Sequence, residues 1–396
     1  MKTGAMAEGM LTEGTMKDRA MQERTVRRTR GRLLSLLLLA VLGGCTEPSQ
    51  QDTVLRLGDV LGGDDTAGYL RADAPRAFSF PADHGPHPGF RNEWWYLTGN
   101  LATADGRRFG YQLTFFNGAL RAPGTPGQPS AWDSERVWMA HLAVSDNDTA
   151  THQALERFAR ENPGLAGADA DHVWLEDWQV HFGDDETPWQ VEAHDAATGL
   201  GVQLDLRALK PPVLQGRDGL SQKSAEPGNA SYYYSLTRLD TTGSVNMNGN
   251  RYQVAGLSWL DREWSTSALT AEQSGWNWLS LQFDSGEELM YYELLDSQGA
   301  ADANSAGNWT DAAGRQTAIA PADIALRPLR RWRSPAGVDY VTAWELDYAG
   351  RRLRVSALFD AQWMGLSLPY WEGAVAVYAA DSGMLVGRGY LEMVRP

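Results

Sequence analysis

Asp261 and Glu263 combine carboxyl chemistry with an aromatic setting. They lie in the segment GLSWLDREW, residues 256–264, where apolar and polar side chains alternate. Residues two apart share one face of a strand, so this alternation predicts Trp259, Asp261 and Glu263 on the same face. A carboxylic acid kept protonated in an apolar, aromatic-walled pocket can serve as a proton donor. The structural alternative is an ion pair of the two carboxylates with Arg262 at a barrel rim.

Two histidines form a second candidate group. His84 and His87 flank Gly85-Pro86, and Asp83 precedes them. This spacing can supply a general base or part of a metal site, but a third strong ligand is missing and we expect no bound metal. The alternative is a rigid loop whose histidines cap strands and hydrogen-bond Glu93.

The segment EWWY after these histidines predicts the start of a strand. Glu93 and Trp95 would share one face, and Trp94 and Tyr96 the other. A carboxylate on an inward face needs a partner, for which Arg91 is the obvious choice. We take Glu93 and Trp95, with the two histidines, as candidate ligand-binding residues. A Trp that closes a barrel beside an ion pair is the alternative.

A run of three tyrosines supplies a further candidate wall. Alternation places Tyr232 and Tyr234 on one face, and barrels that hold apolar ligands use such walls. Plain core packing would explain the same pattern. The sequence has no GxSxG, HExxH, P-loop or GxGxxG motif, so it does not indicate a serine hydrolase, a zinc peptidase or a nucleotide-using enzyme. We expect no cofactor.

The composition restricts the class of protein. The chain has 396 residues, with 35 Lys+Arg against 50 Asp+Glu and a net charge of -15, which argues against a nucleic-acid partner. A hydrophobic content of 43% is enough for folded cores. The single cysteine, Cys45, excludes a disulfide framework and a four-cysteine zinc site.

Short alternating segments predict an all-β fold. Trp94–Leu101 and Phe109–Phe116 flank Asp105-Gly106, which is a strong hairpin signal. About fourteen such segments without intervening helices favour two β-barrel domains, which we place at 77–243 and 244–396, divided near Asp240–Gly249. The best candidate for a helix is Gln153–Arg160.

The N-terminal residues 1–44 read as an export signal. Four arginines between positions 27 and 32 precede an apolar run of ten residues, Leu33–Leu42, which is too short to cross roughly 30 Å of hydrocarbon. Leu-Gly-Gly-Cys follows and resembles a bacterial lipobox, which predicts lipidation of Cys45; an ordinary signal peptide with an incidental cysteine is the alternative. Residues 45–76 are polar and predict a flexible tether.

Three stretches carry a family resemblance. DHGPHPGFRNEWWYLTG, SAEPGNASYYYS and GLSWLDREWS closely resemble the AttH-like, lipocalin-like family that includes the carotenoid 1,2-hydratases (hydroxyneurosporene synthases). The resemblance runs from about Phe78 to Glu392. It implies two tandem lipocalin-like β-barrel domains, in agreement with the strand pattern.

The resemblance also implies a chemistry. The characterised hydratases add water to an isolated carbon–carbon double bond, which needs a strong acid, π-faces beside the cation and a water molecule. By resemblance Asp261 is the candidate acid, with Glu263 second, Trp259 is a cation-stabilising wall, and Tyr232 or Tyr234 is another wall. The hydratases have a different local sequence around this Asp.

Two functions therefore stay open. The first is an exported lipoprotein that binds an apolar lipid or isoprenoid in a barrel, with an ABC permease as a candidate partner because the lipoprotein branch is often encoded beside one. The alternative is an acid-catalysed hydratase with Asp261 as proton donor. Thr46 after Cys45 favours the outer membrane of a Gram-negative cell, with the protein facing the periplasm. Export argues against carotenoid biosynthesis itself.

Overall fold

The computed structural model describes residues 66–125, 133–184, 186–270 and 272–395. The predicted signal segment and Cys45 lie outside the described residues. Within them the regular elements are strands and two short 3-10 helices, η1 (Ala82–His84) and η2 (Pro321–Asp323), which confirms the all-β prediction. The same residues contain no helix long and apolar enough to cross a membrane.

The first sheet occupies most of the chain up to residue 265. Its order is β4-β3-β2-β1-β13-β12-β9-β8-β7-β6-β5, with β10 and β11 also paired to β12. Its paired strands run antiparallel, and β1 and β13 lie near its middle. Its strands are β1 (Asn92–Ala102), β2 (Arg108–Ala119), β3 (Arg136–Asp146), β4 (Thr151–Arg160), β5 (Ala166–Ala168), β6 (His172–Leu175), β7 (Trp178–His181), β8 (Trp189–His194), β9 (Gly201–Ala208), β10 (Val213–Leu214), β11 (Leu220–Gln222), β12 (Ala230–Met247) and β13 (Asn250–Ser265).

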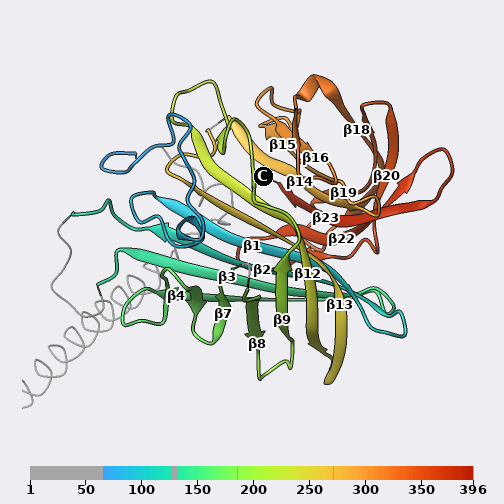
Figure 1. Ribbon diagram of the computed structural model, residues 1–396, viewed down its shortest axis with the longest axis horizontal. Coiled ribbons are helices and arrows are strands. Elements are labelled where there is room, and N and C mark those ends of the chain that lie inside the picture. Colours follow the sequence, from blue (N-terminus) through green and yellow to red (C-terminus); the bar gives the residue numbers. More distant parts are fainter. Residues whose placement is uncertain (1–65, 126–132, 185, 271, 396) are drawn as a thin grey trace, which may run out of the picture. The chain divides into compact units, whose positions relative to one another are not determined.

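The second sheet follows from residue 273 onward. Its order is β17-β16-β15-β14-β23-β22-β20-β19-β18, with β21 also paired to β22. Figure 1 shows these strands in orange to red and those of the first sheet in cyan to yellow. They are β14 (Gln273–Phe283), β15 (Glu288–Asp296), β16 (Ala306–Thr310), β17 (Gln316–Ile319), β18 (Ile324–Arg333), β19 (Asp339–Tyr348), β20 (Arg351–Ala357), β21 (Trp363–Met364), β22 (Tyr370–Ala379) and β23 (Leu385–Val394).

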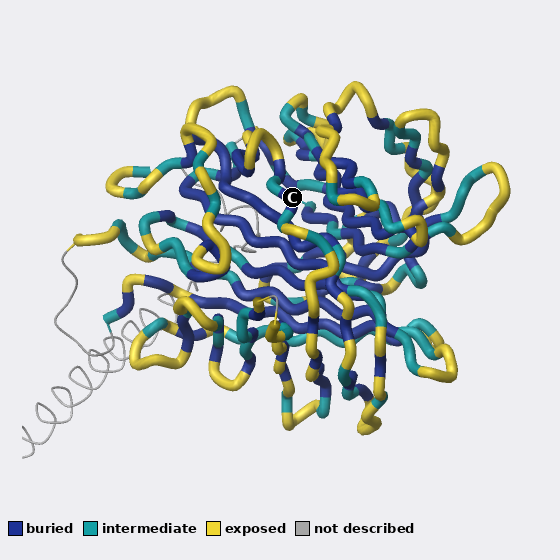
Figure 2. Tube along the Cα trace, viewed as in Figure 1, coloured by how far each residue is buried: buried dark blue, intermediate teal, exposed yellow. Residues whose placement is uncertain are grey.

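Each sheet curls around its own apolar core. The core of the first sheet includes Trp95, Leu97 and Trp264, and that of the second includes Leu281 and Trp371. These two barrel-like halves confirm the predicted fold. Figure 2 shows the buried residues along the middle of the strands and the exposed ones at the loops. Both sheets belong to one compact unit.

The hairpin turns follow from their residues. Gly106 has φ +94 in the predicted β1–β2 hairpin. Asn248 and Gly249 have φ of 51 and 74 and join β12 to β13, as a primed two-residue turn requires. Because β12 and β13 pair with each other inside the first sheet, the change of sheet comes between Ser265 and Gln273, and the domain boundary predicted at 243/244 falls within β12.

Two local predictions need correction. The helix expected at Gln153–Arg160 is strand β4, because pairing with β3 from Val137 to Asp146 outweighs the helix propensity of its residues. The described end of the predicted tether, residues 66–76, is packed on the first sheet: Leu70 N donates to Gly89 O at 2.9 Å, and Ala72 is fully buried. The remainder of the tether lies outside the described residues.

Candidate active site between the two sheets

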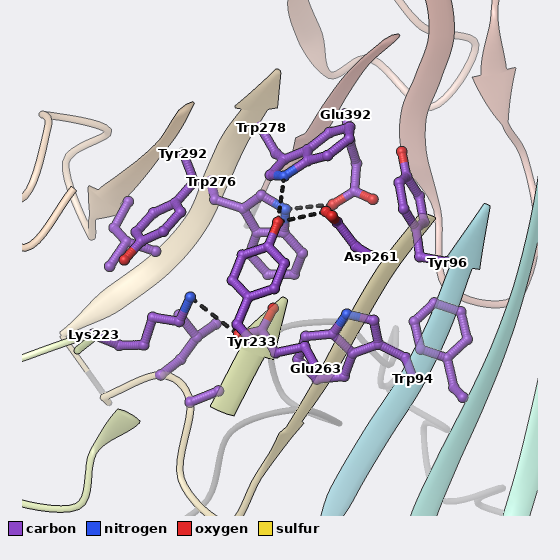
Figure 3. Close-up of a pocket in the computed structure, with 14 residues that line it drawn as sticks. Trp94, Tyr96, Lys223, Tyr233, Asp261, Glu263, Trp276, Trp278, Tyr292 and Glu392 are labelled. Atoms are coloured by element: carbon purple, nitrogen blue, oxygen red, sulfur yellow. Dashed lines mark hydrogen bonds and ion pairs between the residues drawn. The ribbon is translucent and has the colours of Figure 1, made fainter. Parts of the chain in front are cut away.

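A cavity of ≈ 90 Å³ lies between the two sheets. It is smaller than the cavity of about 150 Å³ that admits benzene in a protein core. Its wall combines residues of both sheets with Ala268 and Leu269 from the segment that joins them, and half of the 14 lining residues are aromatic (Figure 3). The lining residues are Trp94, Tyr96, Phe116, Lys223, Tyr233, Asp261, Glu263, Ala268, Leu269, Trp276, Trp278, Tyr292, Leu294 and Glu392.

Strand alternation decides which side chains reach this cavity. On β13, Asp261 and Glu263 line the cavity, whereas Leu260 and Trp264 belong to the core of the first sheet. Trp259 packs in the cluster between the sheets. The predicted common face of Trp259, Asp261 and Glu263 is therefore present in the structure, and it is the face turned away from the core of the first barrel.

Asp261 is buried and surrounded by hydrogen-bond donors. Trp259 Nε1 donates to its Oδ1 at 2.7 Å, Ser235 Oγ donates to the same oxygen, and the Tyr233 hydroxyl donates to Oδ2. Tyr233 in turn accepts a hydrogen bond from Trp278 Nε1 at 3.2 Å. Burial raises the pKa of Asp261 to about 7, against the opposing effect of the three donors. This carboxyl group can therefore hold a proton near neutral pH.

Glu263 is held differently from Asp261. Lys223 Nζ lies 3.1 Å from Glu263 Oε1, and the Ser231 hydroxyl donates to the same carboxylate. Lys223 Nζ also lies 4.0 Å from the ring centre of Tyr292. Burial opposes the charge of Lys223, but Glu263 outweighs it and raises the pKa of the amine. Glu263 is thus the ion-pair partner of Lys223, which suits it to a positioning role.

The second sheet contributes another acid. Glu392 lines the cavity on β23 and stands directly opposite Glu372 on β22. Trp276 Nε1 donates to Glu392, and the Tyr96 hydroxyl donates to Glu372 at 2.7 Å. Burial raises the pKa of Glu392 to about 7, and burial and then the charge of Glu392 raise the pKa of Glu372 well above its usual value. Burial together with the charge of the facing carboxylate favours the protonated form of at least one of the two.

His84 and His87 lie elsewhere, in a network at the first core. His84 Nδ1 is 2.6 Å from the Tyr234 hydroxyl, and burial lowers the pKa of His84 to about 4. His87 stacks on Trp264 with ring centres 3.7 Å apart and contacts Asp83 at 3.1 Å. No group of three or more His, Cys, Asp or Glu in the described ranges is arranged to hold a metal ion.

Glu93 and Trp95 also belong to this network. Glu93 pairs with Arg262 and not with the expected Arg91, and it accepts hydrogen bonds from Asn117 Nδ2 at 2.8 Å and from the His87 amide at 2.9 Å. Burial opposes its charge, but Arg262 brings the pKa of Glu93 down to about 2. The Arg262 guanidinium lies 3.7 Å from the Trp95 ring centre. This buried ion pair under an aromatic ring holds the loop on the strands.

The predicted tyrosine wall is on the wrong face for the cavity. Tyr232 and Tyr234 pack in the core of the first sheet, and the Tyr232 hydroxyl donates to Ala74 O at 2.8 Å. The tyrosine between them, Tyr233, is the one that reaches Asp261. Sequence reasoning therefore missed Tyr233, and it also missed Lys223 and Glu392. Alternation within each strand could not identify Tyr233 as a neighbour of Asp261. The pairing of β12 with β13 decides which residues of the two strands lie side by side, and the sequence alone does not give this pairing.

The family assignment follows from a sequence comparison. Residues 71–395 match the AttH-like family. The chain belongs to the AttH-like family. This confirms the resemblance seen in the three sequence stretches. No curated protein sequence matches the chain significantly.

Solved structures agree with this assignment. The chain is similar to an AttH protein from Nitrosomonas europaea, with 31% identity over 81% of this chain and 98% of that one, and a TM-score of 0.73. Kievitone hydratase from Nectria haematococca shares the fold at 14% identity, with 83% and 95% of the two chains covered and a TM-score of 0.60. CghA, crystallised with Sch210972, shares it at 15% identity, 85% and 97% coverage and a TM-score of 0.50.

Proposed function

We propose that this AttH-like protein binds an apolar molecule between its two sheets and adds water to a carbon–carbon double bond, with Asp261 as proton donor. The observation that carries the proposal is a buried carboxyl group, with a pKa raised to about 7, on the wall of an aromatic cavity. The similarity of the fold to a protein named kievitone hydratase supports the reaction type.

The reaction can be followed through the residues of the cavity. Asp261 gives its proton to one alkene carbon, whose π electrons form the new C–H bond, and the other carbon becomes a cation. The faces of rings such as Trp278 and Tyr233 stabilise this charge. Water attacks the cation, and its surplus proton passes to Glu392, which points into the same space from the other sheet (Figure 3). Alkene and water thus give an alcohol.

The size of the cavity constrains the substrate. A volume of ≈ 90 Å³ takes the reacting end of an apolar molecule and not a whole carotenoid. Trp94, Phe116 and Leu269 in its wall are only half-buried, so the rest of a longer chain has a route toward solvent on that side. We therefore propose an isoprenoid-like or lipid alkene whose terminal double bond enters.

The test compares the wild-type chain, expressed from residue 46, with Asp261→Asn. Both are incubated with farnesene in ¹⁸O-labelled water, and the alcohol product is measured by mass spectrometry. Loss of a positioned acid should reduce turnover by roughly 10²–10⁴-fold while farnesene still binds. Asp240→Asn, at an exposed position of β12, is the matched control and should keep full turnover.

Binding without formation of labelled alcohol would point to a second function. The three hydrogen bonds that Asp261 accepts stabilise its anion, which favours a carrier that binds an apolar ligand without converting it. If wild type binds farnesene and longer isoprenoids but never yields labelled alcohol, the protein is a carrier. An Asp261→Asn protein that does not fold would mark Asp261 as structural.

We also propose, from the N-terminal sequence, an exported lipoprotein anchored through Cys45 in the outer membrane, facing the periplasm, with an ABC permease as its candidate partner. Cys45→Ala should abolish lipid attachment and move the protein from the membrane fraction to the soluble periplasmic fraction. The measurement is cell fractionation with immunoblotting. A variant that stays in the membrane with normal processing would show that Cys45 is not the anchor.

A further inference from the structure

A second cavity lies between the sheets at another position along the same strands. Its volume is ≈ 260 Å³, and its wall includes residues from the end of β1, the start of β2, the end of β14 and the start of β23. Leu257 and Leu358 give it an apolar part, and Arg108 and Arg388 give it charge. None of its lining residues is shared with the cavity at Asp261.

Alternation along two strands brings Arg108 and Arg388 to this place. Phe109 on β2 and Leu391 on β23 belong to the cores of their own sheets, so Arg108 and Arg388 lie on the faces that meet. Two residues farther along each strand the sheets touch: a Cβ on Gly110 would lie 2.8 Å from the Tyr390 hydroxyl. The two arginines therefore approach one another across the interface.

Neither guanidinium group has a hydrogen bond or an ion pair with any described residue. Arg238, which lines the same cavity, is by contrast bound to Glu288 and to Phe283 O at 2.9 Å. Asp284 is the acid of the wall; it is exposed and forms no ion pair with Arg388 in the described structure, and its charge only partly opposes the effect of Arg108 on the pKa of Arg388. Burial, and then the nearby charge of Arg108, lower the pKa of Arg388. The two half-buried guanidinium groups repel each other, and a bound anion would relieve this repulsion.

We propose that Arg108 and Arg388 bind the carboxylate or phosphate group of a small amphiphilic molecule. The planar guanidinium fork pairs with two oxygens of either group, and such charge-assisted hydrogen bonds are the strong ones. The apolar side chains of Leu257 and Leu358 receive the short chain attached to the anion. The site is independent of the reaction proposed at Asp261.

The experiment titrates the chain from residue 46 with hexanoate, hexyl phosphate and 1-hexanol, using isothermal calorimetry. Hexanoate or hexyl phosphate should bind, and hexanol should bind at least ten-fold more weakly. The tighter of the two anions identifies the preferred group. Arg108→Gln and Arg388→Gln should each weaken anion binding by about 10–100-fold, because each removes a charge-assisted contact.

Arg217→Gln is the matched control, since it removes the same charge at an exposed position outside the cavity. It should change the affinity less than two-fold, and thermal melting should show that all three variants are folded. The proposal is overturned if neither anion binds wild type, if hexanol binds as tightly as the anions, or if Arg217→Gln weakens binding as much as the cavity variants.

Discussion

At the scale of single residues, the site separates three carboxyl groups by their surroundings. Asp261 is buried among neutral donors and holds a proton near neutral pH, whereas Glu263 forms an ion pair with Lys223. Glu392 faces Glu372 across two paired strands and accepts a hydrogen bond from Trp276. Different surroundings thus suit these carboxyl groups to different roles. Asp261, the first candidate acid from the sequence, lines the cavity, where it can act as a proton donor.

The raised pKa of Asp261 predicts how stability depends on pH. The folded protein holds this proton more tightly than the unfolded chain, because the pKa rises from 3.8 to about 7. Its contribution to stability is therefore full below about pH 4 and is lost as the pH rises through 7, at about 1.4 kcal/mol per pH unit. Asp261→Asn should lack this loss.

Denaturant unfolding of wild type and Asp261→Asn at pH 5 and pH 8 checks this expectation. The free energy of unfolding of wild type should fall relative to the variant by a few kcal/mol between the two pH values. An equal difference at both pH values would mean that the folded protein does not raise the pKa of Asp261.

At the scale of elements, the close approach of β2 to β22 and β23 holds the two sheets together. Gly110 makes this approach possible: a Cβ there would lie 2.8 Å from Ala374 Cβ as well as from the Tyr390 hydroxyl. Nearby, Asn100 Nδ2 donates across the interface to Gly389 O at 3.0 Å. The two cavities lie on either side of this contact along β2 and β23.

Gly110→Ala should therefore destabilise the protein by about 1–3 kcal/mol, as overpacking at a tight contact does. Gly118→Ala is the matched control on the same strand, because its added Cβ would meet nothing closer than 3.7 Å. It should change stability by about 0.5 kcal/mol or less. Urea unfolding monitored by tryptophan fluorescence measures both. Equal effects of the two substitutions would show that the sheets are not tightly packed at Gly110.

At the scale of the whole molecule, the two barrel-like halves depend on each other. The cluster between them includes Tyr96, Tyr233 and Trp259 from the first sheet and Trp278 and Tyr390 from the second. These aromatic side chains would face water if either half stood alone. A large exposed apolar face of this kind promotes self-association.

Truncation after residue 269 tests this dependence, because it keeps the first sheet and removes the second. The truncated chain should bind the dye ANS strongly and self-associate, whereas the full chain should remain monodisperse in size-exclusion chromatography. The full chain should also unfold in a single transition. A truncated chain that is monomeric and free of dye binding would show that the first half is an independent domain.

The sequence by itself determined the all-β class, the β1–β2 hairpin and the shared face of Trp259, Asp261 and Glu263, because these depend on local alternation and turn chemistry. It also carried the family resemblance. Only the tertiary structure decided which face of the first sheet bears the cavity. In β1, β2 and the second half of β13 both faces are buried, one around the core of the first sheet and the other against the second sheet, so burial signals do not distinguish them.

For the same reason the sequence favoured Tyr232 and Tyr234 over Tyr233. It could not pair Glu93 with Arg262, which is 169 residues away in the chain. Nor could it place Glu392 in the same cavity as Asp261, because only the packing of one sheet on the other brings the two residues together. Alternation gives every strand two faces, and only the packing of the whole chain decides what each face meets.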